Sequence, residues 1–372
     1  SREPPSAKHD AQAKELLVAD EKSQGSHAQN VRDTFPKGDY FVNSRKDLQK
    51  QVKRFVELVF GEPFTTPTED EYNMFLAKSA SYRTADLSRQ VGAVIIDKSG
   101  AVAGTGCNEV PYPGGGFFVE GKKGGIGDNR DFVKQIDPNY AEIQRSLIEL
   151  IRILRRAGYI GDNKSDFKGD VDLVDALLQG HHKELMSNAR IRNLIEFGRI
   201  VHAEMHALCD AAASGRSISG GRLYCTTFPC HGCARHLIAA GIREVVYIEP
   251  YPKSLSLKLY ENEIELAHEE AENCDPNGPF DKVKFRPFHG TSPVLFQRVF
   301  QFRKRKDNRG IVASWVPSEA FPSGASLTVE RPKKEASAAN KVAEVLERAK
   351  VQLGTIGREA SDDVTDTTAT DR

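Results

Sequence analysis

A pair of short motifs constrains the fold and chemistry of this chain more than any other feature: HAE at residues 202–204 and PCHGC at residues 229–233. A catalytic zinc ion takes three protein ligands and leaves its fourth position to water, and one imidazole with two thiolates satisfies that count. The spacing therefore predicts that His202, Cys230 and Cys233 bind Zn²⁺. Glu204 lies two residues beyond the histidine, so we expect it to carry protons and not to bind the metal.

This residue set suits a hydrolytic reaction. Zinc lowers the pKa of its bound water from about 15.7 toward about 7, so that hydroxide is available at neutral pH. We expect Glu204 to take the proton from that water, to protonate a ring nitrogen, and to deliver a proton to departing ammonia. The order H-x-E followed by P-C-x-x-C is the signature of zinc-dependent nucleobase deaminases. Either motif alone is weak evidence, because a bare C-x-x-C is more often a structural zinc site or a redox pair.

The local pattern places both motifs at helix starts. Residues 201–214 are rich in Ala and Leu with Gly215 behind them, which predicts a helix. Residues 222–227 alternate as a strand does, and after the two cysteines we expect a helix at 234–240 and a strand at 244–248. Helix N-termini favour the thiolate form of cysteine, so these positions suit metal ligands.

Further segments narrow the family. They are the helix and strand pattern at 71–94, NEVP at 108–111, GDNRDF at 127–132 and PYPKS at 250–254. With the two zinc motifs they resemble the bacterial anti-phage dCTP deaminases, of the deoxycytidylate deaminase group in the cytidine deaminase superfamily, over residues 35 to about 312. The resemblance implies an α/β fold, a cytidine deaminase-like three-layer α-β-α sandwich with a central mixed sheet and a helical insertion. It also implies conversion of dCTP or dCMP to dUTP or dUMP plus ammonia, with antiviral defence by depletion of dCTP.

The same resemblance suggests a division of the chain. Residues 1–45 look like the end of an upstream P-loop kinase-like domain, and we expect most of that domain to be absent from this chain. The start at Ser1 without a methionine agrees with this expectation. We expect a helical linker at 46–70, the deaminase domain at 71–312 with an insertion at 112–186, and a C-terminal extension with a disordered tail at 313–372. The stretch 294–302 is aromatic and is expected to pack on the core or on a neighbouring subunit.

The insertion contains a predicted amphipathic helix. Its apolar side chains share one face and are Ile143, Leu147, Leu150, Ile151 and Leu154. Four arginines on the same helix, Arg145, Arg152, Arg155 and Arg156, could bind a triphosphate, although a solvated basic face is the more common case.

Substrate contacts follow from the resemblance. It implies that Asn108 hydrogen-bonds the sugar and that the backbone around Thr227 and Phe228 accepts from the exocyclic amine. Arg83, Arg89 and Lys253 are candidates for phosphate binding because each lies beside a matched motif. Arginines are also common on surfaces for solubility alone.

Composition favours a small substrate. The chain has 52 basic and 52 acidic residues, so no global field attracts nucleic acid. The sequence has six cysteines without a disulfide-like framework, no signal-peptide pattern and no membrane-length apolar run, which favours the cytoplasm.

The alternatives to a dCTP deaminase are a housekeeping dCMP deaminase regulated by dCTP and dTTP, a polynucleotide deaminase, or a catalytically idle binding module. We expect a free deoxycytidine nucleotide as substrate, an inhibitory RNA or nucleotide as effector, and homo-oligomers.

Overall fold

The computed structural model describes residues 34–121, 127–161, 169–180, 182–186, 189–267, 281–320 and 322. It divides into two compact units, one formed by Ser1–Leu48 with Pro67–Gln297 and the other by Gln49–Thr66 with Arg298–Arg372. Most of the segment predicted to be the end of a kinase-like domain, and most of the C-terminal extension and tail predicted at 313–372, lie outside the described residues.

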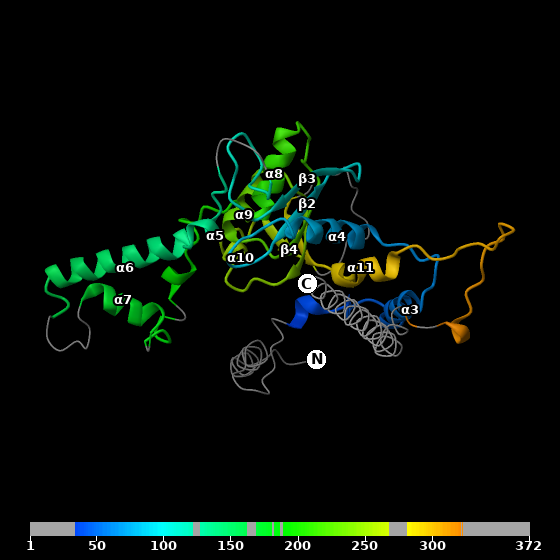
Figure 1. Ribbon diagram of the computed structural model, residues 1–372, viewed down its shortest axis with the longest axis horizontal. Helices are drawn as coiled ribbons and strands as arrows, with labels where there is room; N and C mark the ends of the chain where they lie inside the picture. The colour runs from blue at the N-terminus through cyan, green and yellow to red at the C-terminus, as the bar shows by residue number, and fades with distance from the viewer. Residues whose placement is uncertain are drawn as a thin grey trace, which may run out of the picture. The chain divides into compact units, whose positions relative to one another are not determined.

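The first unit is built around a six-stranded mixed sheet (Figure 1). In spatial order the strands are β3 (Val102–Cys107), β2 (Gly92–Ile96), β4 (Arg222–Thr227), β5 (Glu244–Glu249), β7 (Val283–Pro287) and β6 (Ile264–Leu266). Strand β2 runs antiparallel to both β3 and β4, whereas β4, β5, β7 and β6 are mutually parallel. The carboxyl ends of β4 and β5 therefore meet at one edge of the sheet, where α/β proteins commonly place their sites.

Helices cover both faces of this sheet. On one face α8 (Ala203–Ala213) and α9 (His231–Ala239) pack with Ala207 and Leu237 against strand residues such as Leu223. On the other face α4 (Glu69–Ser81) packs with Met74 and Ala77 against the alternate strand residues, among them Val94, Tyr224 and Val246. The alternation arises because successive side chains of a strand point to opposite faces. The structure thus confirms the predicted three-layer α-β-α sandwich.

The predicted elements around the zinc motifs are present with small shifts. The strand predicted at 222–227 is β4, and the strand predicted at 244–248 is β5. The second helix begins at His231 and not at Ala234, because the sulfur of Cys230 accepts a hydrogen bond from the backbone N–H of Cys233 and caps the helix.

Smaller elements complete the description. Those of the first unit are η1 (Phe35–Lys37), β1 (Tyr40–Phe41), α5 (Asp131–Lys134), α6 (Pro138–Arg156), α7 (Asp170–Leu178), η2 (Arg190–Asn193), α10 (Ser256–Leu259) and β8 (Gly290–Thr291). Strands β1 and β8 pair antiparallel. Helix α3 (Leu48–Val59) and η3 (Pro317–Glu319) lie in the second unit, where Trp315 Nε1 donates to the carbonyl of Phe60 at 3.4 Å. None of the described helices is long and apolar enough to span a membrane.

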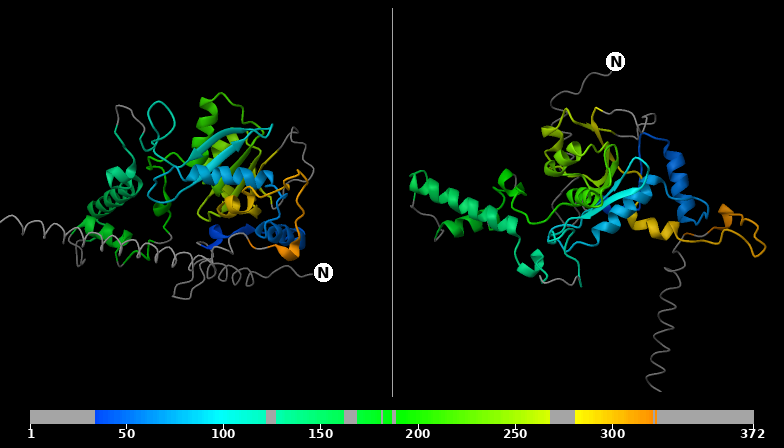
Figure 2. Two further views of the ribbon diagram at one scale, coloured as in Figure 1. Left: turned by 45° about the vertical axis from the view of Figure 1, so that its right-hand side comes forward. Right: turned by 90° about the horizontal axis from the view of Figure 1, so that it is seen from above.

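Helices α6 and α7 form a hairpin with a small core of its own and lie side by side in both views of Figure 2. Ile143, Leu147 and Ile151 of α6 are buried against Val174 and Leu178 of α7. The prediction that Leu150 shares this face is wrong, since its side chain is 49% exposed. It lies on the flank of α6, and the short α7 covers only the central stripe.

Part of the aromatic stretch at 294–302 packs on the core, which is one of the two predicted alternatives, whereas Phe302 at its end is exposed. Helix α11 (Pro293–Phe300) buries Leu295 and Phe296, and the ring of Phe296 stacks on Phe75 of α4 with centroids 4.3 Å apart.

Candidate active site

The zinc motifs are positioned by close contact between α8 and β3. Gly104 and Gly106 of β3 face α8, and a Cβ atom on them would lie 2.3 Å from the carbonyl oxygen of Ala207 and 2.1 Å from that of Ala203. Only glycine allows two backbones to approach so closely. The first turn of α8, which carries Glu204, is therefore held directly against the sheet.

The three predicted ligands come together from two helix starts. His202 is the N-cap of α8, Cys230 is the N-cap of α9, and Cys233 lies in the first turn of α9. Both sulfur atoms lie 3.4 Å from His202 Nδ1, and the three ligand atoms all lie within 4.8 Å of one another. Within the described ranges, this is the cluster of His, Cys and acidic side chains close enough to hold a metal ion, and Glu204 is not part of it.

The donor set fits zinc. A hydrogen bond from Cys233 and contact with His202 outweigh burial and hold the pKa of the Cys230 thiol well below its usual range, which favours the thiolate. One imidazole and two sulfur donors at a buried, three-ligand site are the donors that catalytic zinc prefers. These three residues are thus the zinc-binding His/Cys/Cys set of the fold.

Glu204 lies beside the metal ligands in a dry environment. Its side chain is only 4% exposed, and burial raises the pKa of its carboxyl above the usual value. A raised pKa makes a carboxylate a better proton acceptor, which suits a group that must take up a proton and return it.

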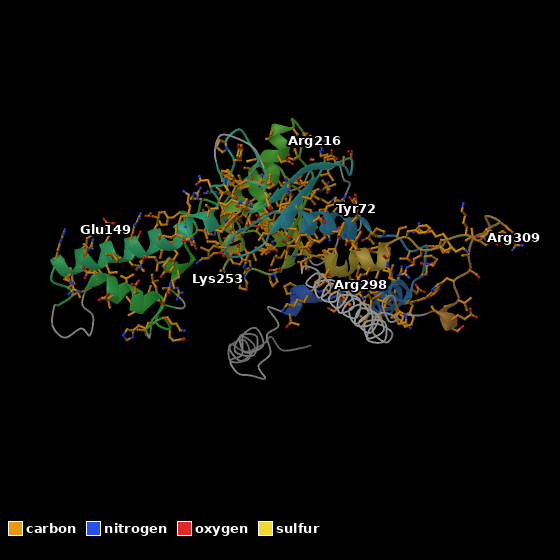
Figure 3. The ribbon with its side chains drawn as sticks, viewed as in Figure 1. Tyr72, Glu149, Arg216, Lys253, Arg298 and Arg309 are labelled. Carbon is orange, nitrogen blue, oxygen red and sulfur yellow. The ribbon has the colours of Figure 1, made fainter. Side chains whose placement is uncertain are left out.

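These side chains open on a cavity of about 440 Å³, large enough for a nucleotide base and sugar. Its lining includes His202, Glu204 and Cys230 together with five of the residues predicted to bind substrate, namely Arg89, Asn108, Thr227, Phe228 and Lys253. Lys253 is among the residues labelled in Figure 3. Sequence-distant residues thus converge on a single pocket.

Asn108 is buried and has a structural task inside this pocket. Its Oδ1 accepts from the backbone N–H of Val91 at 2.7 Å, and its Nδ2 donates to the carbonyl of Arg89 at 2.8 Å. The amide therefore orders the loop that carries Arg89. One N–H of Nδ2 and one lone pair of Oδ1 remain beyond these two hydrogen bonds.

Arg83 does not lie in the pocket with Glu204. Its guanidinium lies over the ring of Phe117 at 4.3 Å and lines a second cavity of about 490 Å³, with Thr105, Glu120, His206 and Asp210. Arg83 lies two residues after Ser81, the last residue of α4, and there its guanidinium meets the ring of Phe117. Its position does not support the predicted role in binding substrate phosphate.

The structure adds pocket residues that sequence reasoning missed. They are Asp86, Ser88, Val91, Asp137, Asn139, Ile195, Gly198, Ile200, Ala203 and Tyr251. Tyr251 lies inside the PYPKS segment and could have been found there, and Arg89 lies 5.9 Å from its ring centroid. No periodicity or motif marked Asn139 or the segment 195–200, which lie at the two ends of the helical hairpin.

The fold and the zinc site together define a zinc-dependent hydrolase of the cytidine deaminase-like class. The sequence profile of the cytidine and deoxycytidylate deaminase zinc-binding region matches residues 67–249. Deoxycytidylate deaminase of enterobacteria phage T2 is 30% identical over 179 residues, which are 48% of this chain and 79% of the phage protein. The chain therefore belongs to the cytidine and deoxycytidylate deaminase family.

Two other comparisons concern a bacterial protein and a solved structure. ComE operon protein 2 of Bacillus subtilis is 40% identical over 53 residues, which are 14% of this chain and 28% of that protein. The crystal structure of dCMP deaminase from cyanophage S-TIM5 aligns over 60% of this chain and 100% of its own, with 17% identity and a TM-score of 0.30.

Proposed function

We propose that this protein deaminates free deoxycytidine nucleotides, releasing ammonia and forming the deoxyuridine nucleotide. The observation that carries the proposal is the convergence of the His202, Cys230 and Cys233 set, the buried Glu204, and two cationic side chains, Arg89 and Lys253, on one cavity. In such a pocket the nucleobase would lie at the zinc-binding set and Glu204, and the phosphate would lie at the two cationic side chains.

When bound, zinc supplies Lewis-acid activation of the water that attacks C4 of cytosine. Glu204 takes the proton of that water and passes it to the ring nitrogen. The same carboxyl then takes the remaining proton of the added hydroxyl, which becomes the carbonyl at C4, and delivers it to the amino group as the C–N bond breaks and ammonia departs. Phe228, buried against Tyr247 and Phe285, forms an apolar wall that keeps the site dry.

The test is ammonia release from dCTP, dCMP, CTP and deoxyadenosine nucleotides by the zinc-loaded protein and its Glu204→Ala variant. Glu149→Ala is the matched control, because Glu149 is exposed on α6, on the side away from α7 (Figure 3). We expect Glu204→Ala to abolish turnover while zinc stays bound, and Glu149→Ala to be unchanged. Normal zinc content with no ammonia release from any substrate would favour an idle binding module.

The phosphate state of the substrate is a finer proposal. We favour dCTP, and with it a role in depleting dCTP during phage infection, on the resemblance of the NEVP, GDNRDF and PYPKS segments alone. A strong preference for dCMP in the same assay would favour a housekeeping dCMP deaminase. A polynucleotide deaminase predicts binding of single-stranded DNA or RNA at low salt, and the neutral net charge argues against it.

A nucleotide effector is also proposed, with the second cavity as its place. Arg83 supplies a cation there, and His206 and Asp210 lie on α8, the helix that carries Glu204. Because Glu120 and Asp210 are acidic, a triphosphate would need an accompanying divalent cation. If this is correct, Arg83→Ala removes any effect of dTTP on the rate of deamination.

The predicted homo-oligomer is a separate proposal, which light scattering would test.

A further inference from the structure

Both ends of the α6–α7 hairpin lie at the wall of the active-site pocket. Asp137 and Asn139, at the start of α6, line the pocket, and so do Ile195, Gly198 and Ile200 on the segment that returns from the hairpin. The return segment then joins the core at a β-bridge between Val201 and Glu109, one residue before His202. The hairpin is thus inserted next to the reacting groups and not at a remote loop.

One side chain connects the two ends. Asn139 Nδ2 donates to the carbonyl of Leu194 at 2.7 Å, and its Oδ1 accepts from the backbone N–H of Phe197 at 3.3 Å. Its own backbone N–H is held at 2.9 Å by Asp137, the N-cap of α6. Asn139 therefore ties the first turn of a 19-residue helix to a segment more than fifty residues later in the chain.

The tied segment contributes little regular structure of its own. It follows the short η2 and forms no helix or strand between Leu194 and Ile200. The pocket residues Ile195 and Gly198 lie next to the two backbone groups that Asn139 binds. Beyond them, Arg199 pairs with the buried Asp131 at 2.6 Å and fixes the far end of the segment.

We propose that Asn139 is a positioning residue that fixes the 195–200 wall of the substrate pocket and so couples the α6–α7 hairpin to substrate affinity. The effect on substrate affinity rests on the proposed function, whereas the role of Asn139 in fixing the 195–200 wall does not depend on it. The zinc ligands and Glu204 are held by α8, α9 and β3, so displacement of the wall changes how substrate is held and leaves the reacting groups in place.

The test compares Asn139→Ala, Asn139→Asp and a matched control, Gln144→Ala, in the zinc-loaded full chain. Gln144 lies on the same helix and donates to Asp175 at 2.6 Å, a contact within the hairpin and away from the pocket. Asn139→Asp keeps the acceptor for the N–H of Phe197 but loses the donor to the carbonyl of Leu194. Because an acidic side chain stabilises a helix N-terminus, this variant also shows whether an effect of Asn139→Ala comes from fraying of α6.

We expect Asn139→Ala to raise KM for the deoxycytidine nucleotide about five- to thirtyfold with kcat changed less than about twofold. Asn139→Asp should raise KM by an intermediate factor, and Gln144→Ala should leave both constants unchanged. A KM for Asn139→Ala within twofold of the wild type, or a loss of kcat at constant KM, would overturn the inference.

Hydrogen exchange separates this inference from the proposed function. Deuterium uptake in peptides covering 194–201 should rise in Asn139→Ala and not in Gln144→Ala, while peptides from β4 and α9 keep wild-type uptake. This readout needs no turnover. An inactive wild-type protein would contradict the proposed function. Unchanged deuterium uptake at 194–201 in Asn139→Ala would instead contradict the positioning role of Asn139.

Discussion

Arg286 and Asp70 form a buried ion pair beneath the sheet face opposite the zinc site, with Nη1 and Nη2 of Arg286 at 2.7 and 3.0 Å from the two carboxylate oxygens. The side chain of Arg286 is 2% exposed and also pairs with Glu244 through Nε at 2.9 Å. Two elements far apart in the chain, α4 and β7, are thereby joined through one guanidinium.

Removal of that guanidinium should destabilise the fold strongly. Arg286→Met leaves the carboxylates of Asp70 and Glu244 buried without their cation, at a cost of about 3–5 kcal/mol in the free energy of unfolding. Arg222→Met is the control, because Arg222 and its partner Glu69 are partly exposed and such pairs contribute at most about 1 kcal/mol. Urea unfolding of both variants checks this; equal losses would contradict it.

The same pair predicts acid sensitivity. Burial raises the pKa of Asp70, but hydrogen bonds and attraction from Arg286 outweigh it and lower that pKa below the usual value. A lowered folded pKa gives stability that is complete above the unfolded pKa of about 3.9 and lost as pH falls through the folded value. The difference in unfolding free energy between wild type and Asp70→Asn should therefore be largest above pH about 5 and shrink toward pH 3. Urea titrations of EDTA-treated protein measure it without interference from zinc release.

Close packing of α8 on β3 predicts that Gly106 tolerates no side chain. Gly106→Ala places a methyl group against the carbonyl of Ala203, so α8 must move, at about 1–3 kcal/mol in stability. Because Glu204 follows Ala203, a shift of about 1 Å should also reduce kcat by about a hundredfold. Gly127→Ala, where a Cβ meets open space, should leave thermal unfolding and kcat unchanged.

Zinc binding should depend on Cys230 and not on the exposed Cys209. Cys230→Ser replaces a thiolate donor, so we expect loss of most bound zinc and of activity, whereas Cys209→Ser keeps both. Zinc at a thousandfold excess over its Kd adds about 4 kcal/mol to the stability of a binding protein, so added zinc should raise the Tm of Cys209→Ser but not of Cys230→Ser. Metal analysis and thermal scans measure this.

The two cavities make different predictions for the candidate cations. Arg89→Ala and Lys253→Ala should each raise KM for a deoxycytidine nucleotide about ten- to a hundredfold, since a hydrogen bond to a charged group contributes about 1.5–3 kcal/mol. The KM for the nucleoside, which has no phosphate, should rise less. Arg83→Ala, in the second cavity, should leave both unchanged without an effector. A loss of substrate affinity in Arg83→Ala would reverse the assignment of the two cavities.

Local spacing alone was enough to predict the zinc-binding set and the place of Glu204 beside it. His202 and Glu204 are two residues apart, and Cys230 and Cys233 share one helical turn, so each motif carries its own geometry. The strand at 222–227 and the flanking helices follow from apolar periodicity, which depends only on neighbouring residues. These features were predictable because the interactions that fix them span a few positions.

The tertiary structure decided what lies at long sequence separation. Asn139 contacts Leu194 across fifty-five positions, and Arg286 contacts Asp70 across more than two hundred, and no periodicity records such pairs. The amphipathic pattern predicted that Leu150 belongs to the buried face of α6, because a sequence pattern cannot show how much of that helix is covered by α7. Arg83 was likewise predicted to bind phosphate because it lies beside a matched motif in the sequence. The sequence by itself determined the zinc-binding set and the position of Glu204 beside it, whereas packing of distant segments decided which cavity each cation lines and what forms the wall of the pocket.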